Sequence, residues 1–331
     1  MLNNKSILIT GGTGTLGRGL VATLLKNYKV KKLVIFSRDE LKQFEMQREF
    51  NSPEMRYFLG DVRDVERLKQ AMRGIDFVIH AAALKQIPAA EYNPIECIKT
   101  NIHGAENVVQ AALFNDVEKV VALSTDKAAN PVNLYGATKL ASDKLFVAAN
   151  NIAGGHRTRF SVVRYGNVVN SRGSVIPFFQ KLIADGKKEL PVTDKRMTRF
   201  LITLEQGIQF ILDSFARMQG GEIFVPKIPS ANIMNIVEAV APPTGISVHE
   251  IGIRPGEKLH EVMCPKDDSH LTIAFPDHFV IRPAIKFTFD IDYTVNQLGQ
   301  KGQPVPEGFT YDSETNSEFL SFQEIQELMR S

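Results

Sequence analysis

The 331-residue sequence contains no tryptophan and only two cysteines, Cys97 and Cys264. Two cysteines are too few for a disulfide framework, and no metal-ligand spacing surrounds them. Both are therefore predicted to be reduced packing residues in a cytoplasmic protein. The seven histidines show no ligand spacing either, so no metal site is predicted.

The sequence also lacks a long apolar run and an excess of charge of one sign. Because no stretch of about 18 uncharged apolar residues occurs, no membrane span is predicted. The first predicted strand reaches a glycine turn by residue 11, so no signal peptide is expected. The 39 basic and 37 acidic residues are interspersed and give a net charge of +2, which argues against a nucleic-acid partner.

What the sequence does contain is a glycine-rich turn between a predicted strand and a predicted helix. Such a turn lets the backbone approach a pyrophosphate closely, and the amino terminus of the helix offers unpaired N–H groups and a partial positive charge. The last glycine allows helix and strand to pack together. The turn predicts dinucleotide binding by Gly11, Thr13, Gly14, Thr15, Leu16 and Gly17.

Predicted strands alternate with helical patterns through the first half of the chain, at 6–10, 32–36, 55–59, 77–80 and 120–123. This order predicts an α/β fold with a doubly wound, parallel, Rossmann-type sheet. The expected domains are a dinucleotide-binding domain at 1–165 and a smaller mixed substrate domain at 166–331. Segments of the second domain are expected to cross back to the sheet. The 44% apolar content is enough for a substantial core.

The residues after the second predicted strand should select the coenzyme. An acid there would bind a ribose 2′-hydroxyl, whereas a base would neutralise a 2′-phosphate. Ser37 and Arg38 come first in this segment, and Arg38 and Lys42 form a cationic notch that favours NADP over NAD, although Asp39 lies near the position of an NAD-type acid. Alternatively, these charged residues are surface charges that open the next helix.

Residues 124–139 bring together hydroxyls, a carboxylate, two ammonium groups and a phenol. Asp126 and Lys127 follow the strand at 120–123, at the sheet edge where open α/β folds bind ligands. Apolar positions at helical spacing from residue 135 onward place Tyr135 and Lys139 one turn apart on one face. A neighbouring ammonium is expected to lower the pKa of Tyr135 so that its phenol accepts a proton.

This combination resembles the extended short-chain dehydrogenase/reductase superfamily over nearly the whole chain. Within it, the chain is similar to the inverting UDP-N-acetylglucosamine 4,6-dehydratases of the pseudaminic acid pathway. The segments that carry this resemblance are 37–42, 123–139, 164–168 and 254–261. Retaining sugar dehydratases have Asp-Glu where this chain has Asp126-Lys127.

The resemblance implies roles for the catalytic residues. Lys127 would be the base at carbon 5 of the sugar and Asp126 the acid at carbon 6. Tyr135 and Lys139 would assist hydride transfer between carbon 4 and the coenzyme, with Thr125 beside them. Desolvation against the sugar is expected to lower the pKa of Lys127. The alternative is that Asp126 and Lys127 form a structural ion pair that caps the loop.

The resemblance also implies further contacts. Coenzyme contacts are assigned to Asp61, Val62, Ala81, Ala82 and Ala83, although small residues also pack well without a ligand. UDP-sugar contacts are assigned to Lys85, Asn167, Arg172, Thr193, Met197, Arg199, Arg254 and Glu257. A diphosphate favours guanidinium groups, and a carboxylate suits ribose hydroxyls. Lys85 as a solvated side chain, and Arg199 and Arg254 as ion pairs between domains, remain alternatives.

Three functions remain open. The chain is expected to be an inverting 4,6-dehydratase. The alternatives are a 4-epimerase or retaining dehydratase on the same scaffold, and a coenzyme-binding sensor without turnover. The complete set of proton-transfer residues argues against the sensor. Helical stretches 94–114 and 135–149 are expected to form the interface of a homo-oligomer, a dimer or a larger ring built from dimers such as a hexamer.

Overall fold

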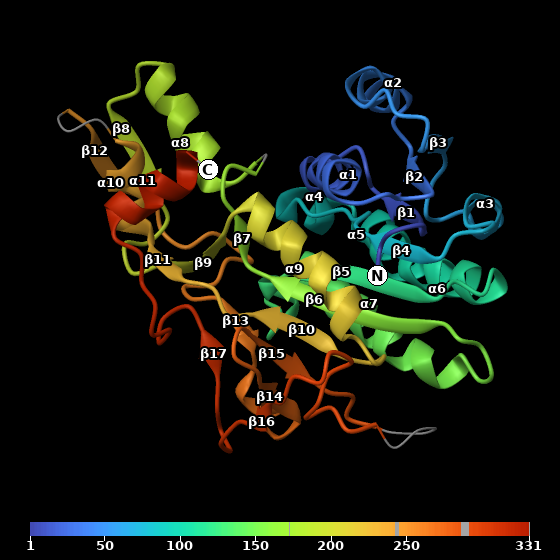
Figure 1. Cartoon of the computed structure of the whole chain (residues 1–331). Helices are drawn as coiled ribbons and strands as arrows, with labels where there is room; N and C mark the ends of the chain where they lie inside the picture. The colour runs from blue at the N-terminus through green and yellow to red at the C-terminus, as the bar shows by residue number, and fades with distance from the viewer. Residues whose placement is uncertain (172, 242–244, 286–290, 331) are drawn as a thin grey trace.

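The computed structural model describes residues 1–171, 173–241, 245–285 and 291–330 (Figure 1). Its first half forms parallel strands in the spatial order β3-β2-β1-β4-β5-β6. These strands are β1 (Ser6–Thr10), β2 (Lys32–Ser37), β3 (Met55–Leu59), β4 (Phe77–His80), β5 (Lys119–Thr125) and β6 (Arg159–Tyr165). The predicted doubly wound parallel sheet is therefore confirmed, with β5 extending two residues further toward Asp126 than expected.

Side chains of the buried strands alternate between two apolar layers, one on each face of the sheet. In β1, Ile7 and Ile9 pack on one face with helices α1 (Thr15–Asn27), α2 (Glu40–Glu49) and α9 (Leu204–Arg217). Leu8 packs on the other face with α3 (Val65–Ala71), α6 (Gly104–Phe114) and α7 (Leu134–Ile152). Each such buried side chain contributes roughly 1.5–3 kcal/mol, so the alternation fixes which face each helix covers.

The second half of the chain extends the same sheet. Strand β10 (Ile223–Pro226) pairs in parallel with β6, and β15 (His278–Ile281) pairs with β10 in the antiparallel sense. Strands β14 (Thr272–Ala274) and β16 (Gln303–Pro304) complete a ten-stranded sheet. Residues beyond 165 thus contribute to the main sheet as well as to a separate lobe.

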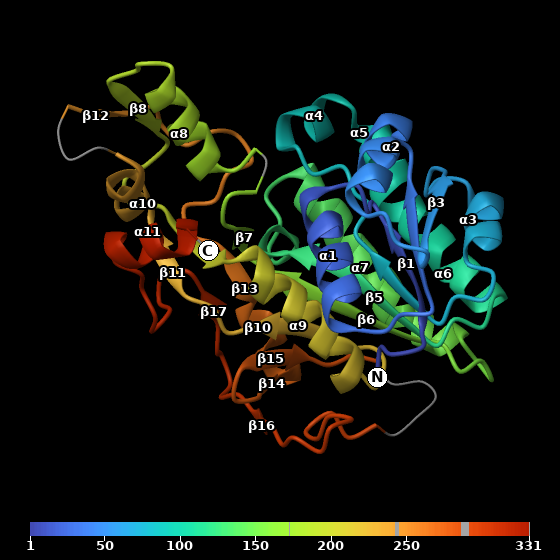
Figure 2. The same ribbon diagram turned by 45° about the horizontal axis from the view of Figure 1, so that its top comes forward.

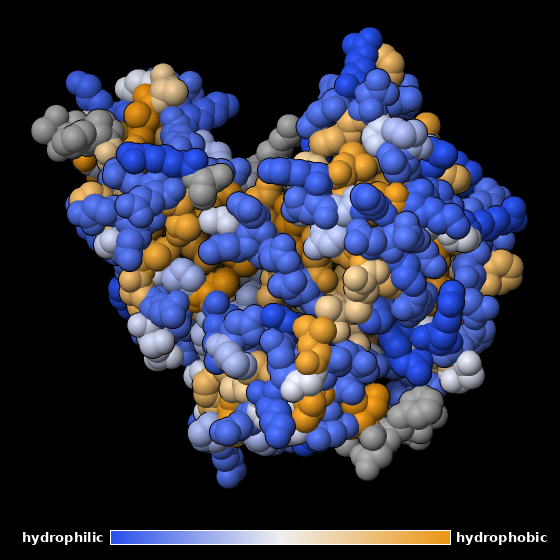
Figure 3. Space-filling model, in the orientation of Figure 1, coloured by the Kyte–Doolittle hydropathy of each residue, from blue (hydrophilic) through white to orange (hydrophobic). Residues whose placement is uncertain are grey.

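The separate lobe has its own apolar cluster, which includes Ile176, Phe179, Leu190, Ile236 and Ile325. It contains α8 (Val175–Ala184), β8 (Glu189–Val192), α10 (Ile233–Val240), β12 (Ser247–Glu250) and α11 (Phe322–Arg330). The lobe stands beside the body of the molecule, across from α1 and α4 (Ile87–Tyr92) (Figures 1 and 2). Figure 3 shows a hollow in the surface between the lobe and the body.

Among the described residues, three small sheets accompany the main sheet. Strand β9 (Thr198–Ile202) lies between β7 (Asn167–Val168) and β11 (Ser230–Asn232). Strand β12 pairs with β8 inside the lobe, and β13 (Val262–Cys264) pairs with β17 (Tyr311–Asp312) beneath it. Chain segments from the second half therefore pass close to the end of β5.

Helix α7 begins one residue before the predicted position because Asn133 caps it, with its side chain accepting a hydrogen bond from Gly136 N at 2.7 Å. The apolar stripe that predicted this helix is not its buried face. Ala137 and Ala148 are exposed, and Leu140 and Leu145 are half-buried. The buried residues of the helix are Gly136, Thr138, Lys139, Ser142, Asp143, Phe146 and Ala149.

In the described ranges, every helix is too short or too polar to span a lipid bilayer.

Candidate active site

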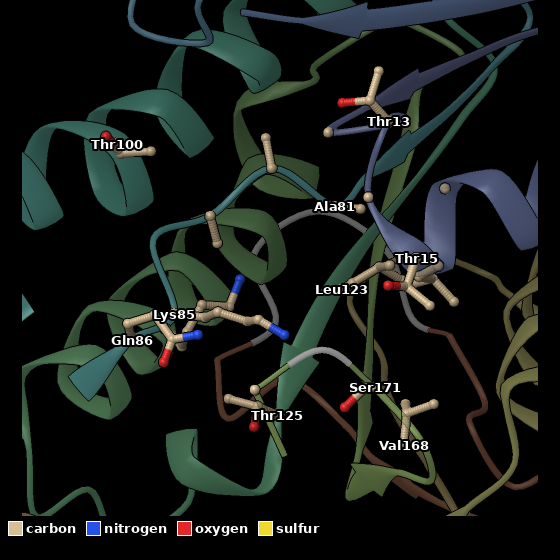
Figure 4. A pocket seen from close by; sticks show the side chains of 18 of the residues that line it. Thr13, Thr15, Ala81, Lys85, Gln86, Thr100, Leu123, Thr125, Val168 and Ser171 are labelled. Atoms are coloured by element: carbon tan, nitrogen blue, oxygen red, sulfur yellow. The ribbon is translucent and has the colours of Figure 1, made fainter. Parts of the chain in front are cut away.

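A cavity of about 600 Å³ opens at the carboxyl ends of the parallel strands (Figure 4). It extends from the glycine turn after β1, past the ends of β4 and β5, to the segment that follows β6. All the residues predicted to bind coenzyme line it, as do all the predicted catalytic residues. They are Gly11, Thr13, Gly14, Thr15, Leu16, Gly17, Ser37, Arg38, Asp39, Lys42, Asp61, Val62, Ala81, Ala82, Ala83, Thr125, Asp126, Lys127, Tyr135 and Lys139.

The glycine turn is held in a shape that side chains would prevent. Gly11 has a φ of +68°, and a Cβ on it would lie 2.9 Å from the backbone nitrogen of Ala82. A Cβ on Gly17 would lie 2.2 Å from the carbonyl oxygen of Gly12. Helix α1 starts after Gly14 without a side-chain cap, so its first N–H groups stay available to an anion at the cavity.

A buried threonine and histidine fix the adjacent strand ends. Thr10 Oγ1 lies 2.8 Å from His80 Nδ1 and accepts hydrogen bonds from Ala81 N at 3.1 Å and Ala82 N at 3.2 Å. Burial, together with the charge of Lys139, lowers the pKa of His80 to about 3, so its ring is neutral. Through these hydrogen bonds, Thr10 and His80 hold the segment 81–83 against the glycine turn.

The charged residues after β2 have defined local partners. Asp39 caps α2 by accepting a hydrogen bond from Lys42 N at 3.0 Å, and its carboxylate lies 2.6 Å from Lys42 Nζ. The hydrogen bonds from Lys42 lower the pKa of Asp39. Arg38 lies 3.5 Å from the Asp61 carboxylate at the cavity wall. Asp39, which lies near the position of an NAD-type acid, is thus engaged by Lys42 and by the start of α2.

A short 3-10 helix, Asp126–Ala128, follows β5 and presents the acid–base residues to the cavity. Thr125 Oγ1 donates a hydrogen bond to Asp126 Oδ1 at 2.8 Å, and Lys127 Nζ donates to the same oxygen at 3.0 Å. The other carboxylate oxygen of Asp126 is buried and has no hydrogen-bond partner in the described part of the chain. Asp126 therefore has a free acceptor position beside the cavity.

The structure corrects the predicted pKa of Lys127. Lys127 Nζ also lies 3.4 Å from Oε1 of Glu261, at the start of β13. Burial lowers the pKa of Lys127, as the sequence suggested, but the charges of Asp126 and Glu261 outweigh burial and the net shift is upward. In this arrangement Lys127 is an ammonium group, because two carboxylates rather than one face it.

The expected lowering of the Tyr135 pKa is also wrong for this structure. Burial raises the pKa of Tyr135 to about 12, and the charge of Lys127 and a hydrogen bond with Thr125 only partly oppose it. Lys139 lies one turn further along α7 and is buried. Burial lowers the pKa of Lys139, and the charge of Asp143, which raises it, does not fully compensate. The ammonium that acts on the Tyr135 phenol is therefore Lys127.

A buried ion pair supports the floor of this site. Arg164 and Asp143 are almost fully buried, and their charged groups lie 3.1 Å apart. Ser124 Oγ donates a hydrogen bond to Asp143 at 2.8 Å, and Arg164 donates to the carbonyl of Met263 at 2.8 Å. The pair links β5, α7, β6 and β13, so it fixes the strand end that carries Asp126.

Two of the predicted substrate-binding residues line the cavity, Lys85 and Asn167. Figure 4 shows Lys85 beside Gln86, on the side of the cavity that faces Thr125. Asn167 has a buried side-chain oxygen without a hydrogen-bond partner among the described residues. Arg172 lies outside the described residues.

The other predicted substrate-binding residues in the described part of the structure do not line the cavity. Arg199 donates hydrogen bonds to the carbonyl oxygens of Thr198, Lys258 and Leu259, and Met197 contacts it through sulfur. Arg254 lies 3.4 Å from Thr193 and 3.4 Å from Glu257. These residues form one group at the junction of body and lobe.

Among the residues of the site that were not predicted, Tyr165 and Glu261 bear on its electrostatics. Tyr165 lines the cavity, and burial together with the nearby Tyr135 raises its pKa. Glu261 contacts Lys127 from a distant part of the chain. Both lie in segments that carried the family resemblance, 164–168 and 254–261, but no spacing in the sequence indicates that either faces the residues after β5.

Comparisons with known proteins agree with this geometry. The family model described as polysaccharide biosynthesis protein matches residues 7–283. The UDP-N-acetylglucosamine 4,6-dehydratase (inverting) of Campylobacter jejuni subsp. jejuni is 63% identical over 330 residues, covering 99% of this chain and 98% of that protein. The UDP-glucose 4-epimerase of Rickettsia akari is 42% identical over 273 residues, covering 81% of this chain and 80% of the relative.

The crystal structure of Pen from Bacillus thuringiensis superposes with a TM-score of 0.89 at 36% identity, covering 100% of this chain and 98% of that one. The resemblance carried by the sequence motifs is thus confirmed over nearly the full length. The chain belongs to the polysaccharide biosynthesis protein family.

Proposed function

We propose that the protein is a UDP-N-acetylglucosamine 4,6-dehydratase that inverts carbon 5, and that its product enters pseudaminic acid biosynthesis. The observation that carries the proposal is the contact between Asp126 and Lys127 at the cavity, 3.0 Å apart and next to Tyr135. An epimerase at carbon 4 needs a tyrosine but no further acid and base. The 63% identity to a relative of that name supports the same assignment.

The residues present fit a nicotinamide dinucleotide. At Gly11 and Gly17 the neighbouring backbone is so close that only glycine, which has no Cβ, fits. The start of α1 has no side-chain cap, so its free N–H groups suit a pyrophosphate. Lys139, a buried ammonium at the cavity wall, suits a ribose hydroxyl. When bound there, the coenzyme would supply reversible hydride transfer between carbon 4 and carbon 6 of the sugar.

The residues around the cavity would then move three protons. Tyr135 accepts the proton of the carbon 4 hydroxyl as this carbon becomes a ketone. The ketone acidifies the hydrogen on carbon 5, and Lys127 removes it. Asp126 donates a proton to the carbon 6 hydroxyl, which leaves as water. The proton that Tyr135 took up is then passed to the opposite face of carbon 5, which completes the inversion and returns Tyr135 to its starting state.

The upward-shifted pKa of Lys127 is compatible with this role because acid and base share one proton. A carboxylate with an ammonium and a carboxylic acid with a neutral amine contain the same number of protons, and the 3.0 Å contact joins Asp126 directly to Lys127. Proton transfer along this contact produces the reactive form. Elimination converts the reactive form back to the ion pair, so the pair is restored after each cycle.

We propose NADP as the coenzyme, with NAD as the alternative. Asp39 is engaged as the cap of α2 and as the partner of Lys42, whereas Arg38 is more than half exposed at the cavity wall. A guanidinium in that position suits a 2′-phosphate. An acid that already accepts two hydrogen bonds is a poorer partner for a ribose hydroxyl.

Arg38→Ala is therefore expected to weaken binding of NADPH by about tenfold or more while changing the affinity for NADH by less than about threefold. Titration of each reduced coenzyme, followed by its fluorescence, measures the two dissociation constants. Arg48→Ala, on the far part of α2, serves as the matched control. Equal losses for both coenzymes in Arg38→Ala would exclude a role in phosphate recognition.

The substrate would enter from the hollow beside the lobe. The buried, unpartnered oxygen of Asn167 and the side chain of Lys85 lie on the cavity, where the sugar is expected to bind. Thr193, Met197, Arg199, Arg254 and Glu257 lie at the junction of body and lobe, and we propose that this junction receives the uridine diphosphate. Residues 166–331 would then form a substrate domain whose sheet segments belong to the body.

We further propose that the protein is a cytoplasmic homo-oligomer, with α6 and α7 at its interface. The two helices pack side by side, and Phe114 and Ile152 at their ends are 67% and 68% exposed. The exposed stripe of α7 continues this apolar surface. Light scattering is expected to give at least twice the monomer mass of 36.9 kDa, and Leu140→Glu to reduce it. A monomer at micromolar concentration would contradict the proposal.

The function is tested by incubating the protein with UDP-N-acetylglucosamine in deuterated water and following the sugar by NMR. The expected product is a 4-keto-6-deoxy sugar that carries deuterium at carbon 5 with inverted configuration. A retained configuration would indicate the retaining dehydratase, and a 4-epimer without deuterium would indicate an epimerase. Coenzyme binding without any product would favour a sensor.

A further inference from the structure

Glu261 is a buried carboxylate surrounded by three cationic side chains. It is 2% exposed and lies directly before β13. Its carboxylate is 3.4 Å from Lys127 Nζ, 3.7 Å from Lys258 Nζ and 3.9 Å from Arg199 Nε. Lys127 comes from the body of the protein, whereas Arg199 and Lys258 come from the second half of the chain.

The backbone of Glu261 is held firmly in this position. Its N–H donates a hydrogen bond to Ser313 Oγ at 2.9 Å, and Ser313 N donates to the carbonyl of Glu261 at 2.8 Å. Ser313 Oγ also lies 2.7 Å from Thr198 Oγ1. The side chain is held differently, because Oε2 is buried without a hydrogen-bond partner in the ranges that the structure describes. Charge, more than hydrogen bonding, therefore directs the carboxylate.

Arg199 and Lys258 also donate hydrogen bonds to backbone carbonyls, and Lys127 is the nearest of the three cations to Glu261. Arg199 directs its terminal nitrogens to carbonyl oxygens, including that of Leu259 at 3.0 Å. Lys258 donates a hydrogen bond to the carbonyl of Ala129 at 2.5 Å. Lys127 is the cation closest to Glu261, and it is also the one that lines the cavity. Glu261 itself lies behind the cavity wall, so it can act on a substrate only through Lys127.

We infer that Glu261 is a positioning residue for Lys127, holding its amine beside Asp126 and stabilising the ammonium that forms when Lys127 removes the proton from carbon 5. The inference deepens the proposed function and rests on it. The arrangement parallels that of a catalytic triad, in which a buried carboxylate orients the general base and stabilises its protonated form. No proton passes to Glu261, because Lys127 exchanges its proton with Asp126.

The charged and titratable groups that face Lys127 define the electrostatic consequence. Asp126 and Glu261 favour its protonated form, whereas Arg199, Lys258 and burial oppose it, and the phenol of Tyr135 lies alongside. Removing the charge of Glu261 makes the Asp126–Lys127 pair release each of its protons more easily. The pair is active only when it holds one proton, so kcat should fall at low pH, where a second proton binds, and at high pH, where the single proton is lost. Both of these limbs of the pH profile of kcat should move to lower pH.

Glu261→Gln tests this inference in the full-length protein with UDP-N-acetylglucosamine as substrate. Its kcat is expected to fall roughly ten- to a hundredfold, with KM changed by less than about threefold and both pH limbs lowered by about one unit. Glu314→Gln is the matched control, since this exposed carboxylate faces His260 and does not line the cavity. It is expected to match the wild type in kcat and in both limbs.

Glu261→Asp tests the same inference if the glutamine variant fails to fold. It keeps the charge but shortens the side chain, so the limbs should return toward their wild-type positions while kcat stays reduced by several-fold. A wild-type kcat in either variant, or a fall in kcat with unmoved limbs in Glu261→Gln, would overturn the inference. A wild-type protein that forms no 4-keto-6-deoxy product would instead refute the proposed function, and so the two failures are distinguishable.

Discussion

Lys127→Ala is expected to reduce formation of the 4-keto-6-deoxy product by roughly a thousandfold while the coenzyme still binds. Lys127 is the amine at the cavity that contacts Asp126, and it follows β5, whereas the glycine turn follows β1. Without it, no base reaches carbon 5. Incorporation of solvent deuterium at carbon 5 should be lost together with dehydration.

The same substitution leaves Asp126 and Glu261 buried without their shared cation, so the variant should also be less stable, by about 1–3 kcal/mol. Thermal unfolding and coenzyme titration therefore accompany the activity measurement. Lys26→Ala, on the exposed last turn of α1, is the control and should behave as the wild type. Turnover at the wild-type rate in Lys127→Ala would dismiss this lysine as the base.

Tyr135→Phe is expected to lower the rate of hydride transfer by about a thousandfold, because the ring remains while the proton acceptor is lost. Formation of the reduced coenzyme in a single turnover, followed by its absorbance, measures this step. The wild-type rate should rise with pH through the neutral range. The pKa of Tyr135, about 12, lies above that range, and only the deprotonated phenol accepts a proton.

The rate that remains in Tyr135→Phe should lose this pH dependence. Tyr92→Phe is the matched control, since Tyr92 is 87% exposed on α4 and outside the cavity. A hydride-transfer rate near that of the wild type in Tyr135→Phe would assign the proton at the carbon 4 hydroxyl to another group. Tyr165, the second phenol on the cavity, would then be the residue to substitute next.

The sequence predicted the strands of the parallel sheet and the location of the cavity well, because both depend on local patterns. A buried parallel strand needs a short apolar run, and a phosphate turn needs glycines between that strand and a helix. Tyr135 and Lys139 share a face because they are one helical turn apart. None of these inferences needed knowledge of residues that are distant in the chain.

The predictions that failed concern electrostatics. The sequence placed one carboxylate beside Lys127, but the fold brings Glu261 to 3.4 Å from its other side and raises the pKa. The sequence also suggested that Lys139 would lower the pKa of Tyr135. In the structure, burial raises the pKa of Tyr135, and the ammonium that partly opposes this is Lys127. A pKa sums the effects of all nearby charges and of desolvation, and neither follows from spacing along the chain.

The sequence by itself determined the sheet, the dinucleotide turn and the residues after β5, because the hydrophobic period and the conformational needs of glycine act over a few residues. Only the tertiary structure decided how the second half of the chain contributes. It added β10, β14, β15 and β16 to the main sheet, placed Arg254 and Glu257 at the junction with the lobe, and set Glu261 against Lys127. Contacts between residues more than a hundred positions apart depend on how whole elements pack, and local sequence patterns do not encode that packing.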